Sequence, residues 1–200
     1  MAQASAALTN WILTRPPVRR ALDYGCGKLR YAPYLARQCS QLGLVDSNVQ
    51  LDRSQVIAGR RTTVKRYAQR HWPSCRIYAI EEFWHGIEEK YDFVLCSNVL
   101  SAIPSYHLRN RSLKAIMSCL RQKGECLFVN QYTNSEFHKA RNRPEAIDHL
   151  DGWILASQKS ASYYGILDRA KTIRILRAIG FRILEAWIDG QSAFVLVGCG

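Results

Sequence analysis

Apolar residues follow two alternating patterns along the chain. Short, nearly continuous apolar runs occur at residues 21–22, 42–45, 77–80, 93–96 and 127–129. Strands that are covered on both faces have this pattern, because neither face meets water. We therefore predict that these five runs are strands of a mainly parallel sheet.

Segments with helical spacing separate these runs. Apolar positions recur three and four residues apart within residues 8–12, 64–71, 113–120 and 173–179. Gly124 and Gly180 are the expected C-terminal caps of the last two helices, and Asp168 is the expected N-cap of the fourth. Strands that alternate with helices are typical of an α/β fold with three layers.

The end of the chain departs from this alternation. Residues 181–188 and 191–198 both read as strands, and Asp189-Gly190 joins them. Asp-Gly between two apolar runs is a strong signal for a tight hairpin turn. We expect the sheet to finish with an antiparallel strand.

Length and composition indicate one ordinary globular domain. The chain has 200 residues, of which 48% are hydrophobic and 22% charged, and it shows no repeats or flexible linkers. We predict a single domain over residues 1–200, with an N-terminal helix within residues 1–20 and an insertion or lid at residues 132–167. No apolar stretch is long enough to cross a membrane, so no membrane partner is expected.

The cysteines indicate the compartment. There are seven, an odd number, and none forms a CxxC pair. A disulfide framework or a zinc site of four cysteines is therefore not expected, and no metal ligands are predicted. Free thiols fit a cytoplasmic protein.

Positive charge is concentrated in one segment. The net charge is +12, and residues 53–80 carry seven basic residues and no acid. Such a segment can bind nucleic acid, or it can be the solvated face of one helix. The residues that would contact nucleic acid are Arg60, Arg61, Lys65, Arg66 and Arg70.

A glycine-containing loop follows the first strand. Gly25 and Gly27 permit a sharp turn and the close approach of a ligand to the backbone. A dinucleotide fingerprint would need a third glycine where Arg30 stands, which argues against NAD or FAD. Asp23 would repel a pyrophosphate, but it suits a ligand with an ammonium or sulfonium charge.

A second acid points to the same kind of ligand. Asp46 ends the second strand, where a carboxylate can accept both hydroxyls of a ribose. It could instead be a helix N-cap without a ligand. A ribose, a positive charge near the loop and no diphosphate together describe S-adenosylmethionine.

These residues resemble motifs of the class I S-adenosylmethionine-dependent methyltransferases, and the resemblance covers nearly the whole chain. Asp23, Gly25 and Gly27 match the acid-x-Gly-x-Gly loop, Asp46 matches the ribose-binding acid, and residues 91–103 match the fourth-strand motif. The third glycine of the family's loop is Leu29 here. The resemblance implies a Rossmann-like sheet of seven strands with an antiparallel last strand.

The resemblance also implies residues that hold the cofactor. In the family an acid after the third strand lies near the adenine, and Glu81 or Glu82 occupies that place. Residues near the ends of strands in this chain complete the expected set. The predicted cofactor-binding residues are Asp23, Tyr24, Gly25, Cys26, Gly27, Asp46, Ser47, Glu81, Glu82, Ser97 and Asn98.

The acceptor is expected to bind at the same edge of the sheet. The insertion follows the fifth strand and carries aromatic residues that could enclose a small organic molecule. The predicted substrate residues are Gln131, Tyr132, Trp153, Tyr163 and Tyr164, and His138 and His149 lie in the same segment. The insertion's apolar residues could equally pack it onto the sheet.

Catalytic residues carry only weak signals. Asn98, His107 and Tyr132 are the candidates, although His107 also fits an exposed histidine at the start of a helix. The fourth strand ends in SNVL, without the Pro-Pro-aromatic motif of amino-methylating DNA enzymes. Cys96 lies within an apolar strand and reads as a buried core thiol.

We expect an S-adenosylmethionine-dependent methyltransferase (EC 2.1.1.-) with an unidentified, small-molecule acceptor. The alternatives are an RNA or DNA methyltransferase that uses the basic segment, and a non-catalytic, cofactor-binding regulatory protein. An oxidoreductase is disfavoured by Arg30.

Overall fold

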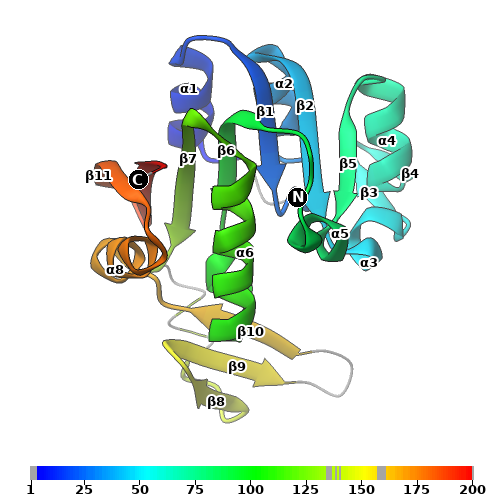
Figure 1. Cartoon of the computed structure of the whole chain (residues 1–200). Coiled ribbons are helices and arrows are strands. Elements are labelled where there is room, and N and C mark those ends of the chain that lie inside the picture. Colours follow the sequence, from blue (N-terminus) through cyan, green and yellow to red (C-terminus); the bar gives the residue numbers. More distant parts are fainter. Residues whose placement is uncertain (1–3, 134–136, 138, 140, 157–160, 200) are drawn as a thin grey trace. The chain divides into compact units, whose positions relative to one another are not determined.

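Seven strands form one sheet in the order β11-β12-β7-β6-β1-β2-β5 (Figure 1). The computed structural model describes residues 4–133, 137, 139, 141–156 and 161–199. The sheet is mostly parallel, with antiparallel last strands, and helices flank it. The α/β, Rossmann-like fold predicted from the sequence is thereby confirmed. The strands are β1 (Val18–Tyr24), β2 (Cys39–Asp46), β5 (Arg76–Ala79), β6 (Tyr91–Ser97), β7 (Leu120–Gln131), β11 (Arg182–Asp189) and β12 (Ser192–Gly198).

The chain divides into two compact units. Unit 1 comprises Met1–Leu95 and Ser118–Glu125, and unit 2 comprises Cys96–Met117 and Cys126–Gly200. In unit 1, β2 pairs in parallel with both β1 and β5. In unit 2, β11 and β12 pair antiparallel.

Buried apolar residues explain the strands of unit 1. The last four residues of β1 are buried, and so are four consecutive residues of β2, including Leu44 and Val45. Gly43 lets the sheet pack closely, because a Cβ there would overlap the hydroxyl of Tyr91 and the side chain of Leu22. The continuous apolar runs are therefore strands covered on both faces, as their pattern indicates.

Five helices of unit 1 lie within the described residues. They are α1 (Ala6–Thr14), α2 (Ala32–Arg37), α3 (Asn48–Asp52), α4 (Val64–His71) and α5 (Ile80–His85). Side chains of Ser5, Ser47 and Thr63 cap α1, α3 and α4 by accepting backbone N–H groups. The predicted face of α1 is confirmed, since Leu8 and Ile12 are buried; on α4 two residues of the predicted face are buried, but His71 is exposed.

A short hairpin between α3 and α4 was not predicted. Strands β3 (Gln55–Ile57) and β4 (Arg60–Thr62) pair antiparallel around Ala58 and Gly59. Both turn residues have positive φ angles, 47° and 80°, as a two-residue hairpin turn requires. The strands are only three residues long and their turn is Ala-Gly, so neither pattern nor turn chemistry stands out in the sequence.

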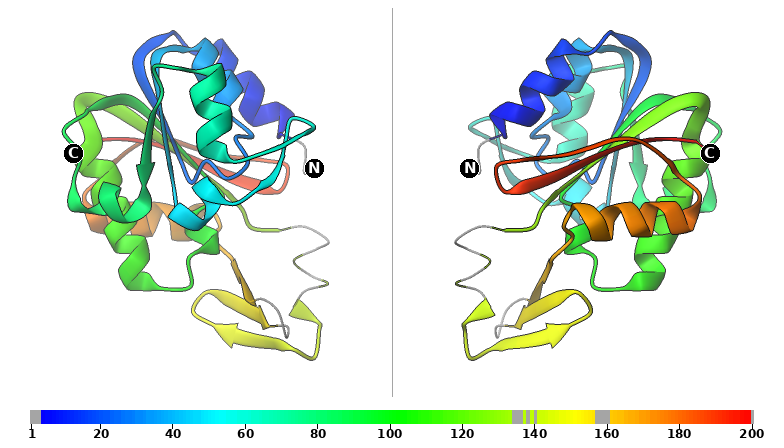
Figure 2. Two further views of the ribbon diagram at one scale, coloured as in Figure 1. Left: turned by 90° about the vertical axis from the view of Figure 1, so that its right-hand side faces the viewer. Right: turned by 90° about the vertical axis from the view of Figure 1, so that its left-hand side faces the viewer.

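Two longer helices shape unit 2. They are α6 (Tyr106–Cys119) and α8 (Arg169–Ile179), and the short 3-10 helix η1 (Leu100–Ala102) precedes α6. The predicted caps of α8 are confirmed: Asp168 accepts the N–H of Lys171 at 2.8 Å, and Gly180 ends the helix with a φ of 108°. The predicted hairpin is confirmed (Figure 2), but its turn residues are Gly190 and Gln191, because Asp189 still belongs to β11 and pairs with Ser192.

The insertion contains a sheet of its own. Strands β8 (Ala146–His149), β9 (Gly152–Ala156) and β10 (Ala161–Gly165) pair antiparallel in the order β10-β9-β8 (Figure 1). Gly152 allows β9 to approach β10 closely, because a Cβ there would overlap the carbonyl oxygen of Tyr164. Residues 132–167 therefore include ordered strands and are more than a long loop.

Two sequence predictions about element ends are wrong. Gly124 lies inside β7 and does not cap α6, which ends at Cys119, and Leu120 already belongs to the strand. Ile80 begins α5 and is not part of the third strand. Apolar residues at a helix–strand junction fit either periodicity, which explains both errors. The predicted N-terminal helix, within residues 1–20, spans Ala6–Thr14 and precedes β1.

Two global expectations can be compared with the structure. Among the described residues, none of the seven cysteines forms a disulfide. None of the helices in the described ranges combines the length and apolar character that a bilayer crossing requires.

Candidate functional site

The glycine loop after β1 has the backbone conformation that its sequence predicts. Gly25 and Gly27 have φ angles of 76° and 54°, in the left-handed region. Leu29, where the family has its third glycine, adopts this region as well, with a φ of 61°. Its side chain is 4% exposed, so burial compensates for a backbone strain of about 1–2 kcal/mol. The substitution thus leaves the loop in a glycine-like conformation.

Asp46, at the end of β2, holds this loop. Its carboxylate accepts the N–H of Gly27 and the N–H of Ser47, each at 2.8 Å. The N-cap of α3 is Ser47, so Asp46 is not the capping residue. Burial raises the pKa of Asp46, while the two N–H donors and Arg53 act in the opposite direction. Each oxygen keeps a second lone pair with which it can accept a hydroxyl.

Asp23 is a buried acid with a strongly raised pKa. It is 3% exposed in the second-last position of β1, and its Oδ2 has no hydrogen-bond partner among the described residues. Burial, followed by repulsion from Asp46, raises its pKa to about 7. A buried carboxylate without a partner costs free energy, so a cationic ligand at this position would be stabilised.

Two further buried polar atoms lack a partner among the described residues. They are Oγ of Ser97, at the end of β6, and Nε1 of Trp153, in β9. Native structures satisfy most buried polar atoms, so each exception requires an explanation. All three residues with such atoms, Asp23 included, are residues that the sequence predicts to bind cofactor or substrate.

The remaining predicted cofactor residues of unit 1 have differing environments. Tyr24 is fully buried and its hydroxyl accepts the N–H of Trp84 at 3.2 Å. Cys26 is 4% exposed, and burial raises its pKa. Glu81 and Glu82 are exposed in the first turn of α5. Ser47 uses its hydroxyl to cap α3.

In unit 2, Asn98 connects the ends of two strands. Its N–H donates to Val129 and its Oδ1 accepts the N–H of Gln131, both at 2.7 Å. Its φ of 58° is uncommon for a residue other than glycine and concentrates at functional sites. Asn98 therefore orients Gln131, which the sequence predicts as a substrate residue.

The other two catalytic candidates lie elsewhere in unit 2. Tyr132 follows β7, and its N–H donates to the carbonyl of Gln191 at 3.2 Å. His107 is the second residue of α6 and is exposed, as expected for a surface histidine at the start of a helix.

The aromatic residues of the insertion form one cluster. Trp153 is stacked on Tyr164 with ring centroids 6.1 Å apart, and both contact Phe137 edge to face. Trp153 is 5% exposed, so its ring is packed inside the insertion. Its Nε1–H remains as a hydrogen-bond donor for a ligand. His138 lies outside the described residues.

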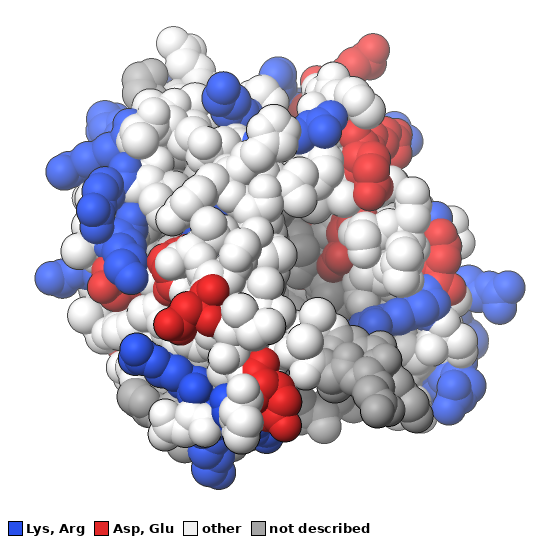
Figure 3. Space-filling view, turned by 90° about the horizontal axis from the view of Figure 1, so that it is seen from below, with Lys and Arg blue, Asp and Glu red and all other residues white. Residues whose placement is uncertain are grey.

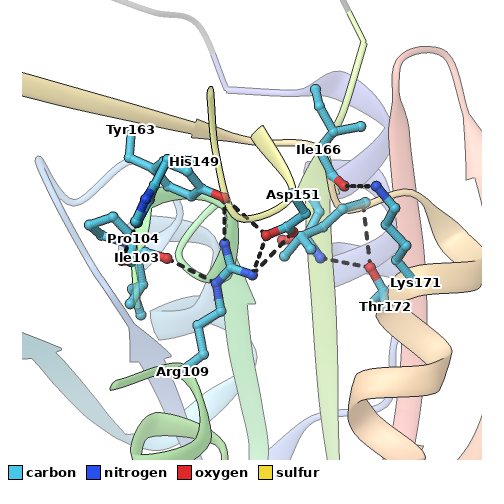
Figure 4. Close-up of polar contacts among 11 residues, drawn as sticks. Ile103, Pro104, Arg109, His149, Asp151, Tyr163, Ile166, Lys171 and Thr172 are labelled. Carbon is cyan, nitrogen blue, oxygen red and sulfur yellow. Dashed lines mark hydrogen bonds and ion pairs between the residues drawn. The ribbon is translucent and has the colours of Figure 1, made fainter. Parts of the chain in front are cut away.

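A buried arginine that the sequence analysis missed ties the insertion to α6 (Figure 4). Arg109 is 1% exposed, and its Nη1 lies 2.9 and 3.1 Å from the carboxylate oxygens of Asp151. Its Nη2 donates to Tyr163 at 3.0 Å, and its Nε donates to the carbonyl of Ile103. Tyr163, predicted to contact substrate, thus belongs to a structural network. Arg109 and Asp151 are 42 positions apart in the sequence, so no local pattern predicts that they pair.

The predicted nucleic-acid residues lie on β4 and α4. Basic side chains lie at both lateral edges of Figure 3, and the right-hand edge is the side on which Figure 1 places these elements. Lys65 pairs with Asp52 at 2.8 Å. The other four, Arg60, Arg61, Arg66 and Arg70, are exposed and make no side-chain ion pair or hydrogen bond within the described part of the chain.

Comparison with known proteins places these features in a family. Residues 2–186 match the family described as "Methyltransferase domain". An Escherichia coli (strain K12) protein named "Uncharacterized protein YmfD" is 39% identical over 178 residues, which are 89% of this chain and 79% of that protein.

Solved methyltransferases share the fold. A "S-adenosylmethionine-dependent methyltransferase" from Clostridium acetobutylicum superposes with a TM-score of 0.66 at 13% identity, over 97% of this chain and 87% of that one. The Burkholderia thailandensis 1,6-didemethyltoxoflavin-N1-methyltransferase, with 1,6-didemethyltoxoflavin and S-adenosylhomocysteine bound, gives 0.64 at 16% identity, over 96% and 75% of the two chains. The resemblance noted in the sequence is confirmed, and the chain belongs to the methyltransferase-domain family.

Proposed function

We propose that this protein transfers a methyl group from S-adenosylmethionine to a small-molecule acceptor. Membership of the methyltransferase-domain family supports the reaction type. The observation that carries the cofactor assignment is the buried, unpartnered Oδ2 of Asp23 beside the glycine loop.

The residues of unit 1 fit this cofactor. S-adenosylmethionine supplies a methyl group on a sulfonium centre and also carries an ammonium group. A positive charge near Asp23 would compensate the carboxylate that the fold leaves without a partner. A diphosphate would be repelled by Asp23 and Asp46 together, which disfavours a dinucleotide.

The ribose and the adenine have candidate partners as well. Asp46 would accept the ribose hydroxyls with the lone pairs that Gly27 and Ser47 leave free. Glu81 and Glu82, at the start of α5, are the proposed residues near the adenine. Tyr24, Cys26 and the loop glycines would form the backbone cradle.

The acceptor side of the proposal rests on unit 2. Ser97 Oγ and Trp153 Nε1 are buried polar groups that need partners, and an acceptor or cofactor with polar atoms would supply them. Gln131, Tyr132 and Tyr164 are the further residues proposed to line the acceptor site. The 1,6-didemethyltoxoflavin methyltransferase, whose acceptor is a small molecule, has the same fold.

The proposed role of the protein in catalysis is alignment of the acceptor and exclusion of water. Asn98 would act as a positioning residue, because it fixes the backbone of Gln131. Tyr132 and His107 are the candidates for removing a proton from the acceptor.

Calorimetry tests the cofactor assignment. S-adenosylmethionine and S-adenosylhomocysteine should bind, and NAD should not. Asp46→Asn should weaken both by about tenfold or more, since hydrogen bonds to charged groups are worth about 1.5–3 kcal/mol. Binding of NAD alone would overturn the proposal.

Radiolabel transfer tests the acceptor class. The protein and labelled S-adenosylmethionine are incubated with cell extract, which is then separated into protein, nucleic-acid and metabolite fractions. We expect the label in the metabolite fraction. Cofactor binding without label in any fraction would instead support the regulatory, non-catalytic alternative.

The exposed arginines of β4 and α4 favour nucleic acid as a second candidate acceptor. Four of them lack side-chain partners in the described residues, so they remain available for phosphate groups. A gel shift with mixed tRNA and duplex DNA at low salt tests this candidate. Arg60→Gln/Arg61→Gln should weaken such a complex and lower its salt dependence, and absence of any shift would exclude it.

A further inference from the structure

Unit 2 contains a cavity that none of the predicted site residues lines. Its volume is about 270 Å³, and its walls come from Tyr106, Asp151, Lys171, Arg174 and Ile175. Tyr106 begins α6, Asp151 lies between β8 and β9, and the other three belong to the first two turns of α8. Three segments far apart in sequence thus build one site.

The charges of this cavity favour an anion. Asp151 is already paired with the buried Arg109, and Tyr163 also donates to it at 3.0 Å (Figure 4). Lys171 donates to the carbonyl of Ile166 at 3.2 Å and has two further N–H donors. Arg174 is exposed and has no partner among the described residues. Two cationic groups therefore remain for a ligand.

The volume and the apolar lining of the cavity favour a ligand that carries an aromatic ring beside its negative charge. Tyr106 and Ile175 provide apolar surface in the same cavity. A cavity of about 150 Å³ is large enough for benzene, so the volume found here holds a substituted benzene ring. Tyr106 is 55% exposed, so a ligand can contact the part of its ring that the Arg109 guanidinium, 5.8 Å from the ring centroid, does not cover.

We propose that this cavity binds a small aromatic carboxylate, with the carboxylate between Lys171 and Arg174 and the ring against Tyr106. Arg174 can hold a carboxylate with two parallel N–H donors. The proposal is independent of the cofactor assignment, because no lining residue belongs to the cofactor set. It adds a ligand class that the methyltransferase family does not by itself specify.

Three probes test the proposal on the full chain by saturation-transfer NMR and calorimetry: benzoate, benzamide and inorganic phosphate. We expect benzoate to bind with a Kd of about 1 mM or lower. Benzamide keeps the ring without the charge, and phosphate keeps a charge without the ring. Each should bind at least about tenfold more weakly, the loss expected for one charge-assisted hydrogen bond or one ring contact.

Matched variants locate the binding site. Arg174→Gln should weaken benzoate binding about tenfold, and Arg177→Gln should leave it unchanged. Both residues are exposed on α8, and only Arg174 lines the cavity. Tyr106→Ala should weaken benzoate and leave phosphate unaffected.

Three results would overturn the proposal. Absence of benzoate binding would remove the ligand class, and equal binding of benzoate and benzamide would remove the role of the charge. An equal effect of the two arginine variants would show that benzoate binds elsewhere. Neither variant alters the proposed cofactor residues, so cofactor binding measured on the same samples tests that assignment separately.

Discussion

Replacing Asp23 by Asn should change stability and cofactor affinity in opposite directions. Asn has the shape of Asp without its charge, and Asp23 is 3% exposed with an unpartnered Oδ2. The free protein should therefore become more stable at neutral pH, because a buried charge is removed. Cofactor binding should become weaker, because the proposed partner of its positive charge is lost.

The magnitude follows from the pKa of Asp23. Burial and Asp46 raise this pKa from 3.8 to about 7. Between about pH 4 and pH 7 the unfolded chain has lost the proton while the native protein keeps it, so the free energy of unfolding falls as pH rises. Each pKa unit corresponds to about 1.36 kcal/mol, so the full penalty above pH 7 is at most about 4 kcal/mol.

Urea unfolding between pH 5 and pH 9 measures this effect. The native protein should lose stability relative to Asp23→Asn up to about pH 7, and the difference should then stay constant at about 1–4 kcal/mol. Asp189→Asn is the matched control, since Asp189 is exposed beside the hairpin turn. Its stability curve should run parallel to that of the native protein.

Calorimetry on the same samples measures the second effect. The affinity of the native protein for S-adenosylmethionine should rise between pH 6 and pH 8, as Asp23 loses its proton. Asp23→Asn should bind more weakly and lose this dependence. If Asp23→Asn were less stable than the native protein at every pH, or bound the cofactor equally well, the reasoning about its buried charge would be refuted.

Three further substitutions test other contacts. Asp46→Ala should lower the free energy of unfolding by about 1–3 kcal/mol in urea, because the N–H of Gly27 loses its acceptor. Arg109→Met should cost about 3–5 kcal/mol, since it leaves Asp151 without its cation. Gly152→Ala should expose the insertion to limited proteolysis, because the new methyl group would overlap the backbone of β10.

Each of these predictions has its own control. The double variant Arg109→Met/Asp151→Leu should recover part of the lost stability, and no recovery would contradict the charge argument. Ile147→Ala serves beside Gly152→Ala, since Ile147 is 60% exposed on β8 of the same small sheet. Equal protease sensitivity of these two variants would refute the packing argument. Asp46→Ala should leave the stability of the insertion unchanged.

The sequence alone determined the strands of the main sheet, the longer helices and the glycine loop. Continuous apolar runs, helical stripes and the Asp189-Gly190 turn are local signals, and each depends on neighbouring residues only. The same holds for the order of Asp23, Gly25, Gly27 and Asp46. Their agreement with the structure follows because strand burial and turn geometry are dictated within a few residues.

Tertiary structure alone decided which of these residues keep a free polar group. Asp46 receives two N–H donors while Oδ2 of Asp23 receives none, although both are acids at the ends of strands. The pairing of Arg109 with Asp151 and the cavity beside it depend on segments that meet only in the folded chain. Burial and partner choice are set by such distant contacts, which periodicity along the chain does not encode.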